Sequence, residues 1–230
     1  MIFSRAFHST LREFRWEKKR QKTRIRSRFT LLQWKLSKRE IPRKLHVGCG
    51  KRRVPGWLNV DIQNSEFDLD LGYGKLPFPD SHFSAVASQH VIEHLELERE
   101  LIPLLYELNR CMVPGAEIWL SCPSMYKVCK SYLEDGGVGL LQDRISRFPN
   151  WSLKGLPPSH IVNKLFHQHG QHKNLFDFPL LTAVLEKTGF VDVKEVDERA
   201  FLNRFPEFPE RNDGFQSIYV SALVPPPSGS

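Results

Sequence analysis

The sequence has no apolar run that approaches the roughly 20 residues of a membrane-spanning helix. Its basic N-terminus is not followed by the apolar stretch of a secretory signal peptide, so we expect none. Internal repeats are also absent, and none of the four cysteines forms a C-x-x-C pair: Cys49, Cys111, Cys122 and Cys129. These absences predict a cytoplasmic protein whose cysteines are reduced and mostly buried.

Acidic residues are scarce in the first part of the chain. Residues 1–44 contain 15 basic and 3 acidic residues, a net charge of +12, and the remaining 18 basic and 23 acidic residues give −5. The overall charge of +7 therefore belongs to an N-terminal arm, and a pI of about 9.3 does not by itself indicate nucleic-acid binding. We predict a basic helical arm over residues 1–43, one domain over 44–223 and a disordered, proline-rich tail over 224–230.

Apolar residues recur at helical spacing in the arm, first at Phe3, Phe7, Leu11 and Phe14, then at Ile25, Phe29, Leu32 and Leu36. This pattern predicts one or two basic amphipathic helices that end before Ile41-Pro42. The arm could lie on an anionic membrane surface, pack on its own domain through the apolar stripe, bind RNA or serve as a mitochondrial presequence. The membrane and packing interpretations rank ahead of RNA.

A glycine pair and an acid follow two apolar segments. The segment Lys44–Gly50 reads KLHVGCG, and Trp57–Asp61 reads WLNVD. Glycines at such a turn let the backbone approach a ligand, and a carboxylate at the end of the next strand can accept hydrogen bonds from ribose hydroxyls. Gly48, Cys49, Gly50 and Asp61 therefore outline a nucleoside-binding edge of an open α/β sheet.

The remaining patterns predict a strand-rich domain. We expect helices at about 92–112, with a kink at Pro103, and at 178–188, capped by Asp177 and stopped by Gly189. Residues 124–175 show no strong periodicity. Seven strands are predicted, the first five of them parallel, near residues 44–48, 57–61, 66–69, 83–88, 116–121, 190–196 and 215–223.

Further motifs follow in order: LPFPD at 76–80, FSAVASQHVIEHL at 83–95 and a late segment that ends in KTGFVDV at 187–193. Over roughly residues 43–223 the set resembles the class I S-adenosylmethionine-dependent methyltransferases, in particular small bacterial enzymes with LHxGCG…PGWxNVD and HVxEHL motifs. The resemblance implies a Rossmann-like sheet of order 3-2-1-4-5-7-6 with the last strand antiparallel. It also implies S-adenosyl-L-methionine as cofactor.

The resemblance also implies cofactor contacts. Many family members carry an acid where His46 stands and a third glycine where Arg52 stands. Asp61 follows Gly50 by only 11 residues, so residues 51–56 should form a tight loop and no helix. The expected cofactor-binding residues are His46, Gly48, Cys49, Gly50, Asp61, Asp70, Leu71, Ser88, Gln89 and His90.

Histidines are the candidates for a catalytic base, because histidine titrates near neutral pH. The candidates are His90, His94, His169 and His172. The alternative is catalysis by alignment alone, with these residues in capping or lid positions. We predict no metal site, because the H-x-H-x-x-H pattern has no cysteine or carboxylate matched to it nearby.

The resemblance thus implies transfer of a methyl group to a small-molecule or saccharide- or lipid-linked acceptor. Residues 124–175 and 201–214 would shape the acceptor pocket. The alternatives are an RNA methyltransferase that uses the basic arm and a non-catalytic binding module with the same fold. The arm could bring the protein to the inner face of a membrane.

Overall fold

The computed structural model describes the backbone of residues 5–226 and the side chains of residues 11 and 13–226. Phe3 and residues 227–230 of the predicted tail lie outside these residues, and the side chain of Phe7 is not described. No helix in the described part of the chain is long and apolar enough to cross a bilayer.

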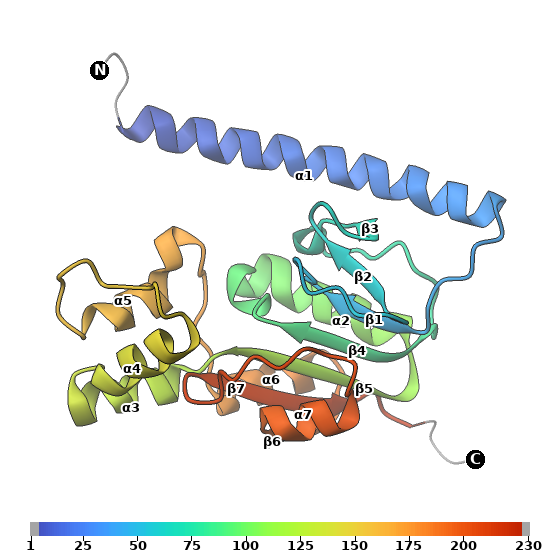
Figure 1. The fold of residues 1–230 in the computed structure, drawn as a ribbon. Helices are drawn as coiled ribbons and strands as arrows, with labels where there is room; N and C mark the ends of the chain where they lie inside the picture. The colour runs from blue at the N-terminus through green and yellow to red at the C-terminus, as the bar shows by residue number, and fades with distance from the viewer. Residues whose placement is uncertain (1–4, 227–230) are drawn as a thin grey trace.

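The domain is built on one seven-stranded sheet of order β3-β2-β1-β4-β5-β7-β6 (Figure 1). The strands from β3 to β5 pair in parallel, and β7 is antiparallel to both of its neighbours. This arrangement confirms the predicted fold class. The strands are β1 (Lys44–Val47), β2 (Leu58–Asp61), β3 (Phe67–Asp68), β4 (Phe83–Gln89), β5 (Met112–Pro123), β6 (Val191–Val196) and β7 (Ser217–Leu223).

Alternate residues of the central strands face opposite layers, as the two-residue period of a strand requires. Val86 of β4 belongs to the larger core, which includes buried leucines of α2 (Ile102–Cys111) and α6 (Phe178–Lys187). Ala85 and Ala87 belong to a second core with phenylalanines of α7 (Glu198–Arg204) and the segment after it. Both faces of the sheet are therefore covered by helices and loops. The edge at the carboxyl-terminal ends of the parallel strands remains for contacts with other molecules.

The predicted helix over 92–112 is broken in the structure. A 3-10 turn covers Ile92–His94, a π-type turn covers Leu97–Leu101, and only then does α2 begin. The Glu96 carboxylate between them accepts a 2.6 Å hydrogen bond from the Arg99 N–H and starts the second segment. Pro103 lies in the first turn of α2, where no backbone N–H is needed, so it begins the helix and does not kink it.

Residues 124–175 are more ordered than their sequence predicts. They form α3 (Met125–Asp135), α4 (Val138–Arg147) and α5 (His160–His167), which share a small core of Val128, Leu140, Ile161 and Leu165. Each of these short helices buries only one or two residues, which is too few to produce a visible period. The prediction for α6 is confirmed, because Asp177 accepts a hydrogen bond from Leu180 N–H and Gly189 follows with a φ of 89°.

The arm forms a single helix, α1 (Arg5–Leu36), which runs along the β3 side of the sheet (Figure 1). It does not pack by the predicted apolar stripe. Thr23, Ser27 and Trp34 face the domain, and the Trp34 ring lies edge-on to Phe67 at 5.2 Å. The apolar stripe faces away from the domain and includes Ile25, Phe29, Leu32 and Leu36, each more than half exposed. The interpretation that the arm packs on its domain through that stripe is therefore wrong, because ion pairs and Trp34 hold the opposite face.

Replacement of Trp34 by alanine should destabilise the protein by about 3 kcal/mol, the lower end for truncating a buried large aromatic side chain. Phe29→Ala on the exposed side of the same helix should change stability by about 0.5 kcal/mol or less. Urea denaturation followed by circular dichroism measures both. Equal effects of the two variants would contradict the orientation of α1.

Candidate functional site

The glycine loop after β1 is tied to β2 by main-chain hydrogen bonds. Gly48 and Cys49 both donate to the Val60 carbonyl, at 2.8 and 3.0 Å. Gly48 has a φ of 70°, and a Cβ there would lie 2.1 Å from Val91 Cγ2. Gly50 also has a positive φ, but a Cβ there would meet nothing within 4 Å. Gly48 is thus required by internal packing, whereas Gly50 borders open space.

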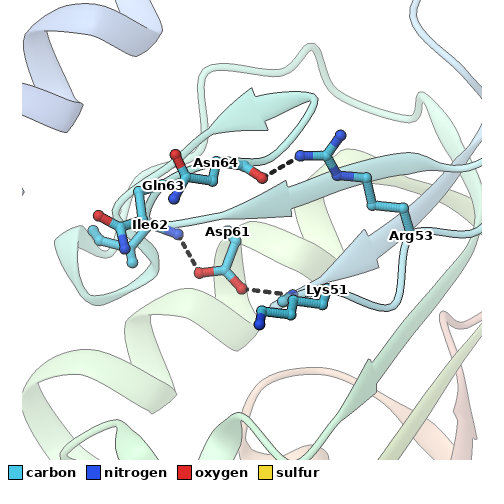
Figure 2. Close-up of a pocket in the computed structure, with 7 residues that line it drawn as sticks. Lys51, Arg53, Asp61, Ile62, Gln63 and Asn64 are labelled. Atoms are coloured by element: carbon cyan, nitrogen blue, oxygen red, sulfur yellow. Dashed lines mark hydrogen bonds between the residues drawn. The ribbon is translucent and has the colours of Figure 1, made fainter.

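Asp61 ends β2 beside this loop. Its Oδ2 accepts a 2.8 Å hydrogen bond from Gly50 N–H, and its Oδ1 accepts a 2.6 Å bond from Ile62 N–H. Figure 2 shows these two bonds fixing the carboxylate among the residues that line a pocket of about 560 Å³. Each carboxylate oxygen retains acceptor capacity for a ligand, because a carboxylate has about four lone-pair sites. The lining residues are Gly50, Lys51, Arg53, Asp61, Ile62, Gln63 and Asn64.

Buried polar atoms without partners lie at the ends of the next two strands. Ser88 and Gln89 end β4 and Ser121 lies opposite in β5. Ser88 Oγ, Gln89 Nε2 and Ser121 Oγ have no hydrogen-bond partner among the described residues. Leaving such a group unsatisfied costs about 1–3 kcal/mol, so this edge has the chemistry to hold a polar ligand. Ligands of open α/β sheets bind at this end of the strands.

His46 and Cys49 are buried beside the loop. His46 Nδ1 lies 3.2 Å from Asn59 Oδ1, and its ring is edge-on to Phe208. Burial lowers the pKa of His46 to about 4 and raises the pKa of the Cys49 thiol to about 11, so both side chains are neutral at pH 7. Asn59 in turn bonds the main chain of Val54 and Trp57, which shapes the tight loop predicted over 51–56. A cofactor contact of His46 or Cys49 stays a prediction.

Asp70 and Leu71 do not line the pocket around Asp61. The Asp70 carboxylate is buried under α1, where it accepts hydrogen bonds from Arg20 Nε at 3.1 Å and Arg24 Nε at 2.6 Å. Leu71 belongs to the larger core. The sequence did not predict that α1 would engage Asp70, because the two segments are distant along the chain. Contact of Asp70 or Leu71 with the adenine stays a prediction.

His90 lies just after β4 with a φ of 57°, an uncommon conformation for a residue with a side chain. Its Nε2 is 2.6 Å from Asp213 Oδ2, and its Nδ1 is 3.4 Å from Glu93 Oε1. Burial lowers the pKa of His90, but the two carboxylates outweigh burial and raise it overall. The surroundings thus favour the charged imidazolium, which is not the form of a general base.

Asp213 connects this histidine to the C-terminal segment. It also accepts a 2.7 Å hydrogen bond from the Tyr219 hydroxyl and a 3.1 Å bond from Arg211 Nε. Burial raises the pKa of Asp213, but His90 and the other donors lower it overall to well below its usual range. Burial and the nearby Asp213 raise the pKa of Tyr219. Asp213 is therefore a buried, charged carboxylate that contacts His90, Arg211 and Tyr219 at once; we call these contacts the Asp213 hub.

The remaining candidate histidines divide into two groups. The rings of His94 and His172 lie 4.8 Å apart, centroid to centroid, whereas His169 lies in an exposed turn outside this group. Burial, the largest effect, lowers the pKa of His172. A catalytic role for any of the four histidines stays a prediction.

The sequence did not single out Asp213, Tyr219 or Glu198. Glu198 accepts hydrogen bonds from the backbone N–H groups of residues 211–213 and so fixes the loop that carries Asp213. The only signal was the position of this loop, since residues 201–214 were expected at the acceptor site. No local motif marks the individual residues.

No family model matches the chain, and no curated protein matches it. Solved structures with a similar fold include an S-adenosylmethionine-dependent methyltransferase from Archaeoglobus fulgidus, at 19% identity and a TM-score of 0.44, over 92% of this chain and 99% of that one. A putative methyltransferase from Bacillus halodurans is 13% identical with a TM-score of 0.45, over 81% and 93% of the two chains.

Phosphoethanolamine N-methyltransferase 2 of Haemonchus contortus, solved with S-adenosyl-L-methionine, is 14% identical with a TM-score of 0.44. The match covers 80% of this chain and 49% of that one, so the chain spans about half the length of that enzyme. At these identities and TM-scores the likeness concerns the fold alone, and the argument for activity rests on the residues described above.

Replacement of Asp213 by alanine should destabilise the protein by about 3–5 kcal/mol, because it leaves the buried His90 without its carboxylate partner. Tyr219→Phe removes one hydrogen bond to a charged group and should cost about 1.5–3 kcal/mol. Asp192→Ala removes an exposed pair with Lys194 and should cost about 1 kcal/mol or less. Urea denaturation at pH 7 ranks the three variants. An Asp213 variant as stable as the Asp192 variant would rule out a structural role for this hub.

Proposed function

We propose that the protein transfers a methyl group from S-adenosyl-L-methionine to an acceptor. The observation that carries the proposal is the carboxylate of Asp61, which two main-chain N–H groups hold at the rim of a pocket beside the glycine loop. Asp61 would accept hydrogen bonds from the ribose hydroxyls, and the backbone of Gly48–Gly50 would lie along the nucleoside. When bound, the cofactor supplies a methyl group on a sulfonium, which is an excellent leaving group.

The residues at the ends of β4 and β5 fit the same proposal. Ser88, Gln89 and Ser121 are buried at this edge and have polar atoms without a hydrogen-bond partner among the described residues. His90 and Glu93 follow directly, so the acceptor would enter between this turn and the C-terminal loop that carries Asp213. The protein's part is then to align the acceptor with the methyl group, a contribution that does not require a base.

Asp61→Ala should weaken S-adenosyl-L-methionine binding by about 1.5–3 kcal/mol, the usual contribution of hydrogen bonds to a charged group. Asp80→Ala removes an exposed carboxylate elsewhere and serves as the matched control. Isothermal titration calorimetry measures both affinities, with circular dichroism as the check on folding. A folded Asp61 variant that binds the cofactor as tightly as the Asp80 variant would exclude this site.

We further propose that α1 rests on an anionic membrane surface and brings the domain to a lipid-linked acceptor. The support is the exposed apolar stripe on the face of α1 that points away from the domain: Phe14, Ile25, Phe29, Leu32 and Leu36. Exposed basic residues accompany it along the helix, namely Arg15, Lys18, Lys22, Arg26, Arg28 and Lys35. Apolar side chains between cations fit the headgroup region of an anionic bilayer, where each basic residue contributes about 1 kcal/mol.

An RNA backbone would use the charges but leave the apolar stripe in water. The RNA methyltransferase alternative is therefore less well supported than the membrane. A second copy of the chain could also cover the stripe. A membrane, an RNA and a second copy of the chain as partners of the stripe predict different outcomes in flotation, RNA-binding and sedimentation experiments.

The full-length protein should float with vesicles of phosphatidylserine and phosphatidylcholine at low salt, and less at high salt. Phe29→Asp with Leu32→Asp should abolish flotation. Gln33→Asp with Ser37→Asp adds the same charge beside the stripe and should retain most of it. If the wild-type protein stays at the bottom of the gradient at low salt, the membrane proposal is wrong. Salt-sensitive RNA binding or dimers in sedimentation would then identify the occupant.

A further inference from the structure

Glu93, His94 and His172 converge at the end of β4. Each offers one ligand atom, and these atoms all lie within 4.8 Å of one another. Glu93 and His94 belong to the turn Ile92–His94, and His172 comes from the segment between α5 and α6. The Glu93 carbonyl accepts hydrogen bonds from the N–H groups of Lys173 and Asn174, at 2.8 and 3.3 Å. The backbone therefore fixes the two segments against each other at this point.

Main-chain carbonyls orient both imidazoles. His94 Nδ1 lies 3.2 Å from the Gln171 carbonyl, and His172 Nδ1 lies 2.5 Å from the Leu165 carbonyl. Since a carbonyl only accepts, both Nδ1 atoms must carry the proton, and both Nε2 atoms keep a lone pair. His172 Nε2 is buried and has no partner among the described residues. Histidines that bind metals are oriented in this way, with the other ring N–H donated to a carbonyl or carboxylate.

Glu93 is 1% exposed, and neither of its carboxylate oxygens has a hydrogen-bond partner in the described part of the chain. His90 Nδ1 lies 3.4 Å from Glu93 Oε1, and His90 Nε2 already contacts Asp213. A buried carboxylate is costly unless it is paired and hydrogen-bonded or coordinates a metal. The negative charge of the Glu93 carboxylate can therefore be paired with a further cation.

We propose that Glu93, His94 and His172 bind one divalent cation, Zn²⁺ in the first instance. Two histidines and one glutamate form a ligand set of catalytic zinc sites, in which the fourth position stays open to water or substrate. With zinc–ligand bonds of about 2.0–2.2 Å, tetrahedral ligand atoms lie roughly 3.3–3.5 Å apart. Since the present separations reach at most 4.8 Å, the side chains must close in by up to about 1.4 Å. The open position would take an oxygen or nitrogen of the acceptor.

No metal site was expected from the sequence, because no cysteine or carboxylate is matched to His167, His169 and His172 nearby along the chain. The structure supplies Glu93 from a distant segment and leaves His167 and His169 exposed. The competing interpretation is that His90 alone neutralises Glu93 and that His94 and His172 close a polar lid. The two interpretations differ in one measurable property, the affinity for a metal ion.

The test uses the full-length chain without a polyhistidine tag, freed of metal by dialysis against a chelator. Zn²⁺ titrated in the calorimeter against a competing chelator should bind with a stoichiometry of one. Co²⁺ should give the visible absorption of a tetrahedral site. His94→Ala and His172→Ala should each lower the Zn²⁺ affinity by at least about 100-fold, since loss of an outer-shell partner already costs about 10–100-fold.

His167→Ala and His169→Ala are the matched controls, since both residues are exposed neighbours in the same segment. Their affinities should stay within about threefold of wild type, since neither is a ligand or an outer-shell partner. Absence of stoichiometric Zn²⁺ binding, or ligand variants that bind as the controls do, would overturn the proposal. Glu93→Gln tests the third ligand. If the Glu93→Gln variant does not fold, the Zn²⁺ affinity of the His94→Ala variant still tests the proposal, because His94 is only half-buried.

The titration contains no S-adenosyl-L-methionine and does not involve Asp61. The metal site and the proposed methyl donor can therefore succeed or fail separately.

Discussion

The parallel pairing of β1 with both β2 and β4 determines where the glycine loop, Asp61 and the residues after β4 lie. Val47 pairs with Val60 on one side and with Ser88 on the other, so all three strands end at the same level. The glycine loop, Asp61 and the turn that carries His90 and Glu93 follow these three ends directly. A one-residue shift of register would turn alternate side chains to the other face and separate the groups.

Two later segments complete this edge, and both are held by specific bonds. Glu198 binds the backbone of residues 211–213 and presents Asp213 to His90. The N–H groups of Lys173 and Asn174 bind the Glu93 carbonyl and present His172 to His94. The proposed nucleoside side of the site is therefore built from local sequence, whereas the proposed acceptor side depends on contacts between distant segments. Such contacts are the more easily changed in evolution, because loops accept substitution more readily than the strands that they connect.

This division explains how much could be predicted from the sequence. Gly48, Gly50 and Asp61 stand within one strand–loop–strand unit, so their spacing alone indicated a nucleoside edge. The sheet order followed from the resemblance, and the structure confirms it. The partnership of Glu93 with His172 could not be predicted, since nothing in either segment points to the other. The same holds for Asp213, which is one acid among many until the fold places it against His90.

Two predictions about helices were wrong for other reasons: the continuous helix over 92–112 and the packing of α1 through its apolar stripe. In the segment 92–112, Ile92 and Leu101 face the same core from separate turns, so apolar residues on both sides of a break do not indicate one continuous helix. For α1, the apolar stripe predicts that another apolar surface covers the stripe. It does not identify that surface as the chain's own domain. The mildly acidic body instead pairs with the basic face of α1, where Arg20 and Arg24 contact Asp70. Arg39, just after α1, pairs with Glu66.

An ion-pair chain also connects α1 with the segment that carries His172. Arg20 Nη1 lies 2.8 Å from Glu100 Oε1, and Glu100 Oε2 accepts a 2.6 Å bond from Lys173 Nζ, next to His172. Burial raises the pKa of Glu100, but the Glu96 N–H, Lys173 and Arg20 outweigh it and lower the pKa overall, so the carboxylate stays charged. Glu100 therefore lies between α1 and the segment that carries His172, and it pairs with a basic residue of each.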